Sequence, residues 1–262
     1  RRTMSARLLP EHLQGLPPAA FAAQNVACML GSFDPFHNGH KMMAEQLLSK
    51  FDVLLLLVPG SHFEKTVVEG VNAPLEQRLE MLSAMYGGDD RVGIGISPQV
   101  LFIRLFGDLR AIFPCANVTF GMGNDVFECL LDSKHYFETQ GLTWSPSDEA
   151  VLNILSKNSV VFGRHAEGEV LTREFSVGES EKESLPLQPA PGTLGRTRSS
   201  EGVGVVIRRV SSSGSSEVSE SVARTSSSAV RDAISRGEDI SVHVPPAIAE
   251  YVAGKGLYKG AK

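Results

Sequence analysis

The chain has 262 residues, of which 42% are hydrophobic, and a formal net charge of −5. This length and composition can build the core of one α/β domain or of two small domains. The acidic balance gives no reason to expect a nucleic acid or a membrane as a partner, so any phosphate site must be made by local charge. Small polyanionic substrates suit such a chain better.

Two further features bear on the compartment. The cysteines are odd in number and lack the spacing of a zinc site, which favours a reduced intracellular compartment, cytoplasmic or nuclear. The longest apolar run, 53–58, is too short to span a bilayer, and no apolar core of a secretory signal precedes residue 25. We therefore expect a soluble protein whose residues 1–24 form an N-terminal arm. The cysteines are Cys28, Cys115 and Cys129.

Short apolar runs recur along the chain and alternate with helical patterns. Runs that are apolar throughout, rather than at every second residue, are typical of a parallel sheet covered by helices on both faces. The sequence therefore predicts a Rossmann-like, doubly wound parallel sheet in a single domain, 25–262. Ligands bind such a sheet beyond the carboxyl ends of its strands, where the loops 31–40, 59–65 and 121–125 fall. Strands are predicted at 26–30, 53–58, 92–96, 118–120, 159–162 and 203–207, and helices at 41–50, 75–86 and 102–113.

The interval from about 176 to 225 interrupts this pattern. It is rich in Ser, Gly, Pro and Glu, and apart from 203–210 it lacks the apolar side chains needed to offset the entropy of ordering. We expect a long disordered insertion at about 176–202 and a serine-rich stretch at about 211–225. A tolerated surface insertion is the simpler interpretation, and a regulatory element is the alternative.

The most informative segment follows the first apolar run and reads GSFDPFHNGH, residues 31–40. A strand that runs into a glycine turn and then a helix places His37 and His40 beside free backbone N–H groups, where a phosphate can sit. Histidine donors at this position stabilise charge on a transferring phosphoryl group without a covalent bond to it. The alternative is a turn whose histidines only cap the helix.

This segment resembles the G-x-F-D-P-x-H-x-G-H signature of the nucleotidylyltransferase superfamily. Far downstream, SSSAVR at 226–231 resembles the I-S-S-T-x-x-R motif of that superfamily, and 237–258 resembles the C-terminal end of nicotinamide and nicotinate mononucleotide adenylyltransferases. The resemblance covers most of 24–165 and 203–258. It implies an enzyme that joins ATP and nicotinamide or nicotinate mononucleotide into NAD or its deamido form plus pyrophosphate, by direct in-line transfer with Mg²⁺ on the phosphates.

The resemblance also implies roles for individual residues. His37, His40 and Arg231 would be catalytic, with both imidazoles on the ATP phosphates and the Arg231 guanidinium on the β- and γ-phosphates. Glycine in the turn at 121–125 would let the backbone approach the adenine. The carboxylate of Asp125 in the same turn would accept hydrogen bonds from the ribose hydroxyls. No residue is assigned as a metal ligand. The remaining ATP-binding residues would be Gly31, Ser32, Phe33, Gly123, Asp125, Ser227 and Ser228, and the mononucleotide-binding residues Ser32, Phe33, Lys65, Trp144 and Arg164.

Several of these assignments have plainer alternatives. The serines at 227–228 suit a helix cap, Asp125 an ordinary strand-to-helix turn, Lys65 a solvated surface and Trp144 core packing. The stretch 99–107 lacks the polar pattern of the family, so the orientation of the pyridine ring and the choice between amide and carboxylate stay open. Another phosphate acceptor, such as phosphopantetheine, and a non-catalytic nucleotide sensor remain alternative functions, and self-association into a homo-oligomer is left open.

Overall fold

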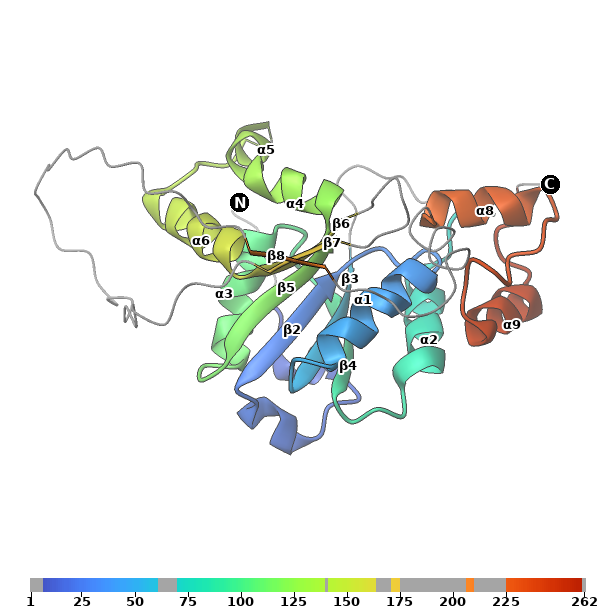
Figure 1. The fold of residues 1–262 in the computed structure, drawn as a ribbon, viewed down its shortest axis with the longest axis horizontal. Helices are drawn as coiled ribbons and strands as arrows, with labels where there is room; N and C mark the ends of the chain where they lie inside the picture. Colours follow the sequence, from blue (N-terminus) through green and yellow to red (C-terminus); the bar gives the residue numbers. More distant parts are fainter. Residues whose placement is uncertain are drawn as a thin grey trace, which may run out of the picture.

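The computed structural model of this chain describes residues 7–60, 70–139, 141–163, 171–174, 206–209 and 225–260. In this part of the chain, one sheet has the strand order β1-β4-β3-β2-β5-β6-β7-β8 (Figure 1). The strands are β1 Leu13–Gln14, β2 Asn25–Leu30, β3 Val53–Pro59, β4 Val92–Ser97, β5 Asn117–Gly123, β6 Ser159–Gly163, β7 Leu171–Glu174 and β8 Val206–Arg209. The helices are α1 Asn38–Leu48, α2 Leu75–Tyr86, α3 Phe102–Ile112, α4 Asn124–Leu131, α5 Ser133–Thr139, α6 Pro146–Lys157, α8 Ser227–Ser235 and α9 Pro246–Lys255, with 3-10 turns at Pro10–His12 and Pro18–Ala22.

The centre of the sheet is parallel. Strands β4, β3, β2, β5 and β6 all run in one direction, whereas β1 at one edge and β7 and β8 at the other pair antiparallel. The chain passes from β2 outward through β3 to β4 and then returns to the other side of β2 as β5. The strand order therefore reverses between β2 and β5, which is where doubly wound sheets bind their ligands. The predicted doubly wound parallel sheet is confirmed.

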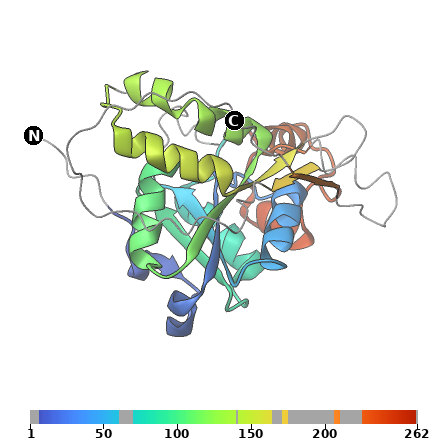
Figure 2. The ribbon, with the colours of Figure 1, turned by 60° about the vertical axis from the view of Figure 1, so that its left-hand side comes forward.

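Alternate residues of the central strands feed two separate cores. In β2, Val26 and Cys28 pack with side chains of α3, α4, α5 and α6, while Ala27 and Met29 pack with side chains of α1, α2, α8 and α9. Figures 1 and 2 show these two groups of helices on opposite faces of the sheet. Burial on both faces explains why these strands read as continuous apolar runs, since β3 is buried at every position.

Several predicted boundaries differ from the structure. The helix at 75–86 coincides with α2, whereas the helix predicted at 41–50 begins earlier, at Asn38. Residues 121–125 were expected to form a loop, but β5 continues to Gly123 and α4 begins at Asn124. The run predicted as a parallel strand at 203–207 is described from Val206, as β8, and it pairs antiparallel with β7 at the sheet edge.

The segment predicted as an N-terminal arm, 1–24, contributes to the domain. Leu8 and Leu13 are only 2% and 6% exposed, and β1 pairs with β4. The backbone N–H of Leu8 also donates to the buried carboxylate of Asp108, at 3.0 Å. The domain therefore begins well before residue 25. The predicted insertion at 176–202 and the serine-rich stretch at 211–225, apart from Thr225, lie outside the described residues.

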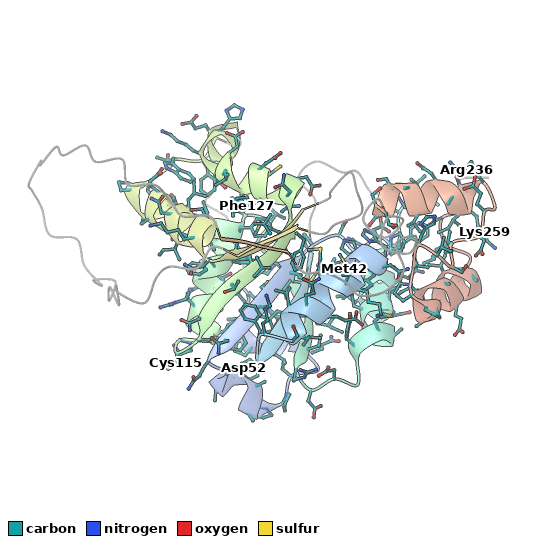
Figure 3. The ribbon with its side chains drawn as sticks, in the orientation of Figure 1. Met42, Asp52, Cys115, Phe127, Arg236 and Lys259 are labelled. Atoms are coloured by element: carbon teal, nitrogen blue, oxygen red, sulfur yellow. The ribbon has the colours of Figure 1, made fainter. Side chains whose placement is uncertain are left out.

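The cysteines do not pair with one another. Cys28 is buried in β2, and burial raises the pKa of its thiol, whereas Cys115 and Cys129 are exposed. Figure 3 shows Cys115 near the start of β5, remote from Arg236 and Lys259 on the C-terminal helical segment. Within the described ranges, no helix is long and apolar enough to cross a membrane.

Candidate active site

The loop after β2 lies at the reversal point of the sheet and has an unusual backbone. The N–H of Gly31 donates to the carbonyl of Leu57 at 3.1 Å, and the peptide bond between Asp34 and Pro35 is cis. Phe33 has a φ of 45°, which is uncommon for a bulky residue and persists only where its surroundings fix it. Its ring is 1% exposed and packs over Gly31, where a Cβ would come within 3.1 Å of the ring.

His37 and His40 hold each other at the start of α1. The N–H of His37 donates to Nδ1 of His40 at 3.3 Å, and the N–H of His40 donates to Nδ1 of His37 at 3.4 Å. The two rings stack with centroids 3.7 Å apart, and the rings of Phe33 and Phe36 lie 5.1 and 5.4 Å from that of His40. A neutral imidazole that accepts at Nδ1 carries its proton on Nε2. Both histidines are therefore arranged as Nε2–H donors.

This arrangement corrects the expected phosphate site in one respect. The sequence suggested free N–H groups at the mouth of the helix, but Asn38 donates its N–H to the carbonyl of His243 at 2.9 Å and His40 donates to His37. Two of the first three N–H groups of α1 are thus already paired. The alternative that the histidines cap the helix holds in the structure, yet capping engages Nδ1 and does not compete with donation from Nε2.

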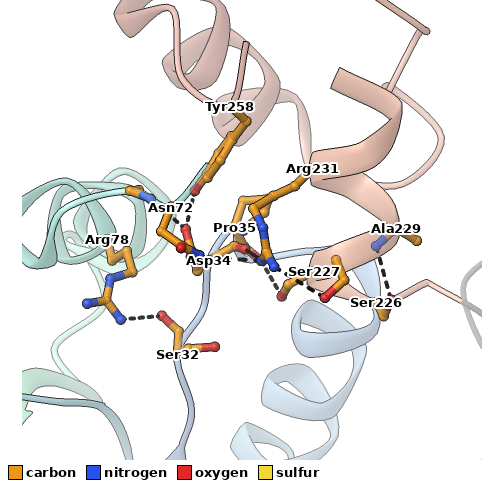
Figure 4. A network of polar contacts seen from close by, with 12 residues as sticks. Ser32, Asp34, Pro35, Asn72, Arg78, Ser226, Ser227, Ala229, Arg231 and Tyr258 are labelled. Atoms are coloured by element: carbon orange, nitrogen blue, oxygen red, sulfur yellow. Dashed lines mark hydrogen bonds and ion pairs between the residues drawn. The ribbon is translucent and has the colours of Figure 1, made fainter. Parts of the chain in front are cut away.

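The second motif lies against the first. Ser226 caps α8 by accepting from the N–H of Ala229 at 3.2 Å, and the hydroxyl of Ser227 donates to the carbonyl of Pro35 at 3.0 Å. Arg231 donates from Nη1 to the carbonyl of Asp34 at 2.5 Å (Figure 4). These contacts join segments that lie 192 and 197 residues apart in the chain.

Arg231 is more enclosed than its sequence position suggests. Its side chain is only 16% exposed, although it lies one turn into a helix near the end of the chain. Besides its bond to the loop, it donates from Nη2 to the hydroxyl of Ser228 at 3.2 Å. The serine cap of α8 is Ser226, so Ser227 and Ser228 are the first two residues of the helix rather than residues before it.

Asp34 organises this region. Its carboxylate is buried, with Oδ1 accepting from the N–H of Ala73 at 3.0 Å and from the hydroxyl of Tyr258 at 2.7 Å. Its Oδ2 accepts from Asn72 at 2.8 Å and lies 3.8 Å from Nη1 of Arg231. One carboxylate thus connects the loop after β2 with the segment before α2, with α8 and with the C-terminal end of the described chain (Figure 4).

The sequence did not indicate which residues would contact the loop after β2. Arg78 of α2 donates from Nη1 to the carbonyl of Ser32 at 3.3 Å; burial lowers the pKa of its guanidinium, and the nearby charge of Asp34 acts in the opposite direction. Asp34 lies inside the signature motif, which was signal enough to suspect it. Asn72 and Arg78 stand in no recognisable motif, and Tyr258 lies in the stretch 237–258 that resembles the family's C-terminal end but was given no role there. The fold brings all three residues to the loop.

The predicted nucleotide-binding residues after β5 lie at the same edge of the sheet. Gly123 ends β5, next to β2, and is the residue before α4. A Cβ at Gly123 would come within 2.7 Å of Oδ1 of Asp125, so the carboxylate folds back over the glycine. A side chain larger than hydrogen at 123 would displace that carboxylate.

Trp144 has a partly buried position just before α6. Its ring meets that of Phe137 edge-on at 5.1 Å, and its Nε1–H donates to Glu149 at 2.9 Å. Trp144 also packs against the hydrophobic core with α3 to α6. The core-packing alternative therefore holds in the structure, and the role of Trp144 at the mononucleotide stays a prediction. Lys65 and Arg164, the other predicted mononucleotide contacts, lie outside the described residues.

Comparisons with known proteins agree with this arrangement. Residues 28–130 match the cytidylyltransferase-like family. A probable nicotinate-nucleotide adenylyltransferase of Saccharopolyspora erythraea is 30% identical over 115 residues, which are 41% of this chain and 53% of that protein. A protein of the same name from Rubrobacter xylanophilus is 36% identical over 62 residues, 23% of this chain and 29% of that protein. The chain therefore spans about half or less of the length of these relatives.

The fold has solved counterparts. A Plasmodium falciparum nicotinic acid mononucleotide adenylyltransferase complexed with NaAD superposes with a TM-score of 0.53 at 16% identity, covering 90% of this chain and 98% of that one. The same protein complexed with APC superposes with a TM-score of 0.52 at 15% identity, with the same coverage. At such identities the likeness concerns the fold. Over residues 28–130 the chain is thus similar to the cytidylyltransferase-like family, and the relatives that it matches are named probable nicotinate-nucleotide adenylyltransferases.

Proposed function

We propose that the chain transfers the adenylyl group of ATP to the phosphate of nicotinate or nicotinamide mononucleotide. A phosphate oxygen of the mononucleotide attacks the α-phosphorus of ATP, the bond from that phosphorus to the bridging oxygen breaks, and pyrophosphate leaves. One observation carries the proposal. The loop after β2, at the reversal point of the sheet, leads into the stacked pair His37 and His40 and also accepts a hydrogen bond from Arg231 of α8.

The histidine pair suits this reaction because phosphoryl-type transfer needs positioning and charge stabilisation more than covalent help. His37 and His40 supply two Nε2–H donors whose rings are fixed by stacking and by the capping bonds at Nδ1. Preformed donors of this kind stabilise charge that grows on the α-phosphate oxygens without having to reorganise. In this proposal His40 stabilises the transferring phosphate and His37 the neighbouring one.

Arg231 suits the leaving group. Its planar guanidinium has five N–H donors, of which the contacts to Asp34 and Ser228 use two. The remaining donors match the oxygens of the β- and γ-phosphates in a fixed fork, with the first turn of α8 beside them. In this proposal Ser227 holds that turn against the histidine loop through the carbonyl of Pro35, and Ser228 holds the guanidinium of Arg231.

Magnesium enters this proposal with the substrate. Among the described residues no group of three or more His, Cys, Asp or Glu side chains could hold a metal ion. Mg²⁺ is commonly bound through substrate phosphates with few protein ligands, so we assign it to the ATP phosphates, where it neutralises charge. The residues named above then act on the MgATP complex.

Fewer of the residues proposed to bind the mononucleotide are among those that the structure describes. Trp144 offers an aromatic face near the start of α6, and stacking on a flat cationic pyridine ring is physically favourable. Lys65, Arg164, Ser32 and Phe33 complete the proposed mononucleotide contacts. The names of the matched relatives, both probable nicotinate-nucleotide adenylyltransferases, favour the nicotinate form.

A pyrophosphate-release assay with MgATP and a panel of acceptors tests the proposal. Nicotinate mononucleotide, nicotinamide mononucleotide and phosphopantetheine are supplied separately at matched concentrations. We expect turnover with a pyridine mononucleotide, and a dinucleotide product identified by mass. Turnover with phosphopantetheine alone would replace the proposed acceptor, and binding of ATP without turnover on any acceptor would favour a nucleotide sensor.

A further inference from the structure

The hydroxyl of Tyr258 makes a contact that the proposed reaction does not use. Tyr258 follows α9, is 3% exposed and has a φ of 61°, in the left-handed region. A bulky side chain adopts that conformation only where its surroundings impose it. Its hydroxyl donates to Oδ1 of Asp34 at 2.7 Å, across 224 residues of chain. Burial and the neighbouring charge of Asp34 both raise the pKa of Tyr258, so the hydroxyl stays protonated and remains a donor.

The contact between Tyr258 and Asp34 affects the geometry of the ion pair between Asp34 and Arg231. A guanidinium beside a carboxylate normally forms two parallel bonds with N–O distances of about 2.7–2.9 Å. Here Nη1 of Arg231 lies 3.8 Å from Oδ2 and bonds instead to the backbone carbonyl of Asp34. The carboxylate already accepts from Tyr258, from the N–H of Ala73 and from Asn72. Oδ1 therefore already accepts two hydrogen bonds and Oδ2 one, which leaves no site on Oδ1 for the second bond of a bidentate arginine.

We propose that Tyr258 is a positioning residue for Arg231: by occupying Oδ1 of Asp34, it keeps the guanidinium off the carboxylate and available to the phosphates of ATP. This inference rests on the role given to Arg231 in the proposed function. Without the hydroxyl, Oδ1 loses a donor in a buried setting, and the guanidinium of Arg231, whose Nη1 lies 3.8 Å from Oδ2, is close enough to replace it. The arginine then pairs with Asp34 and withdraws from the nucleotide.

The test compares two tyrosine hydroxyls that both donate to a carboxylate. Tyr258→Phe removes the contact with Asp34 and keeps the buried ring, while Tyr251→Phe removes a hydroxyl that donates to Glu80 of α2, away from the loop. Binding is measured by calorimetry for an ATP analogue with a methylene bridge between the α- and β-phosphorus, and for adenosine. Because a hydrogen bond to a charged group is lost, we expect Tyr258→Phe to weaken the binding of the ATP analogue roughly tenfold. Adenosine binding by this variant, and both affinities of Tyr251→Phe, should match the wild type.

A double-mutant cycle identifies the route of the effect. If Tyr258 acts through Arg231, Tyr258→Phe should change the affinity for the analogue very little in an Arg231→Lys background. An undiminished loss in that background, or an equal loss for adenosine, would overturn the inference and make Tyr258 a packing residue. If Tyr258→Phe does not fold, as judged by circular dichroism, Asn72→Ala is measured in its place, because it removes a donor from Oδ2 of Asp34. The results that would support or overturn the inference are then the same. Because these measurements need no turnover, an inactive wild type that binds the analogue would refute the proposed function and leave the inference standing.

Discussion

The imidazole of His40 has two nitrogens with different tasks. Nδ1 accepts the N–H of His37 and so fixes the first turn of α1, while Nε2 carries the proton that we assign to the transferring phosphate. Because the stability of the turn and the proposed chemistry use different atoms of one ring, they can be separated by substitution.

Replacing His40 by Asn tests this separation. The side-chain oxygen of Asn can accept at the position of Nδ1, but Asn has no group at the position of Nε2. We expect His40→Asn to keep thermal stability close to wild type and to lower kcat by a hundredfold or more, since removing one preformed donor costs about 2.7–4 kcal/mol in comparable sites. His40→Ala should lose activity similarly and, in addition, about 1 kcal/mol of stability with the cap. Steady-state kinetics and thermal melts measure both, and near wild-type turnover of either variant would rule out the proposed role.

At the residue scale, the sequence predicted what lies within contiguous motifs. His37 and His40 were selected from their residue type and spacing after a strand, and Arg231 from the resemblance of 226–231 to the family motif. The partners of Asp34 were not selected, because Asn72 and Tyr258 are 38 and 224 residues away from it and meet it only through the fold. The paired N–H of Asn38 was missed for the same reason, since its acceptor is the distant carbonyl of His243.

At the element scale, the position of α1 on the sheet decides where the histidines lie. Helix α1 packs across β5 at Gly121, where a Cβ would lie 2.4 Å from Cδ1 of Leu47. Leu47 is itself 1% exposed and has little room to move. The absence of a side chain at 121 therefore allows the helix that carries His40 to approach the strand closely.

Gly121→Ala should disturb both packing and catalysis. Forcing a methyl group into a filled core costs about 1–3 kcal/mol, and the displaced helix carries His37 and His40 with it. We expect a lower free energy of unfolding in urea and a lower kcat. Gly107→Ala in α3 is the matched control: a Cβ there meets nothing within 4 Å, and alanine should stabilise the helix by up to about 1 kcal/mol. If both variants behaved alike, close packing at Gly121 would not be what positions α1.

The elements that the sequence predicted are those buried on both faces. Continuous apolar runs marked the strands β2 to β6, although β5 proved longer than its apolar stretch. Strands β1 and β7 were missed because β1 has only two residues and β7 has no apolar run, so neither carries a periodic signal. The first two residues of α4, Asn124 and Asp125, were predicted as loop because they follow a pair of glycines that is typical of turns.

At the scale of the whole molecule, the two ends of the described chain lie on different sides of the sheet. The C-terminal helices α8 and α9 contribute to the core with α1 and α2, and Leu8 and Leu13 contribute to the core with α3. The first association completes the candidate site, because it brings Arg231 and Tyr258 to the loop. The second extends the sheet at β4 and serves stability.

Adjacent leucines near the start of the chain test whether the segment before β2 belongs to the domain. Leu8 is 2% exposed and lies in the core, whereas Leu9 is 42% exposed. Leu8→Ala should lower the free energy of unfolding by about 2–5 kcal/mol, the usual cost of truncating a buried leucine, while Leu9→Ala should change it by less than about 0.5 kcal/mol. Urea unfolding of both variants measures the difference. Because the segment serves the core rather than the histidine loop, the kcat of folded Leu8→Ala should stay near wild type. If both substitutions changed the free energy of unfolding equally little, the segment before β2 would be an arm that does not belong to the folded domain.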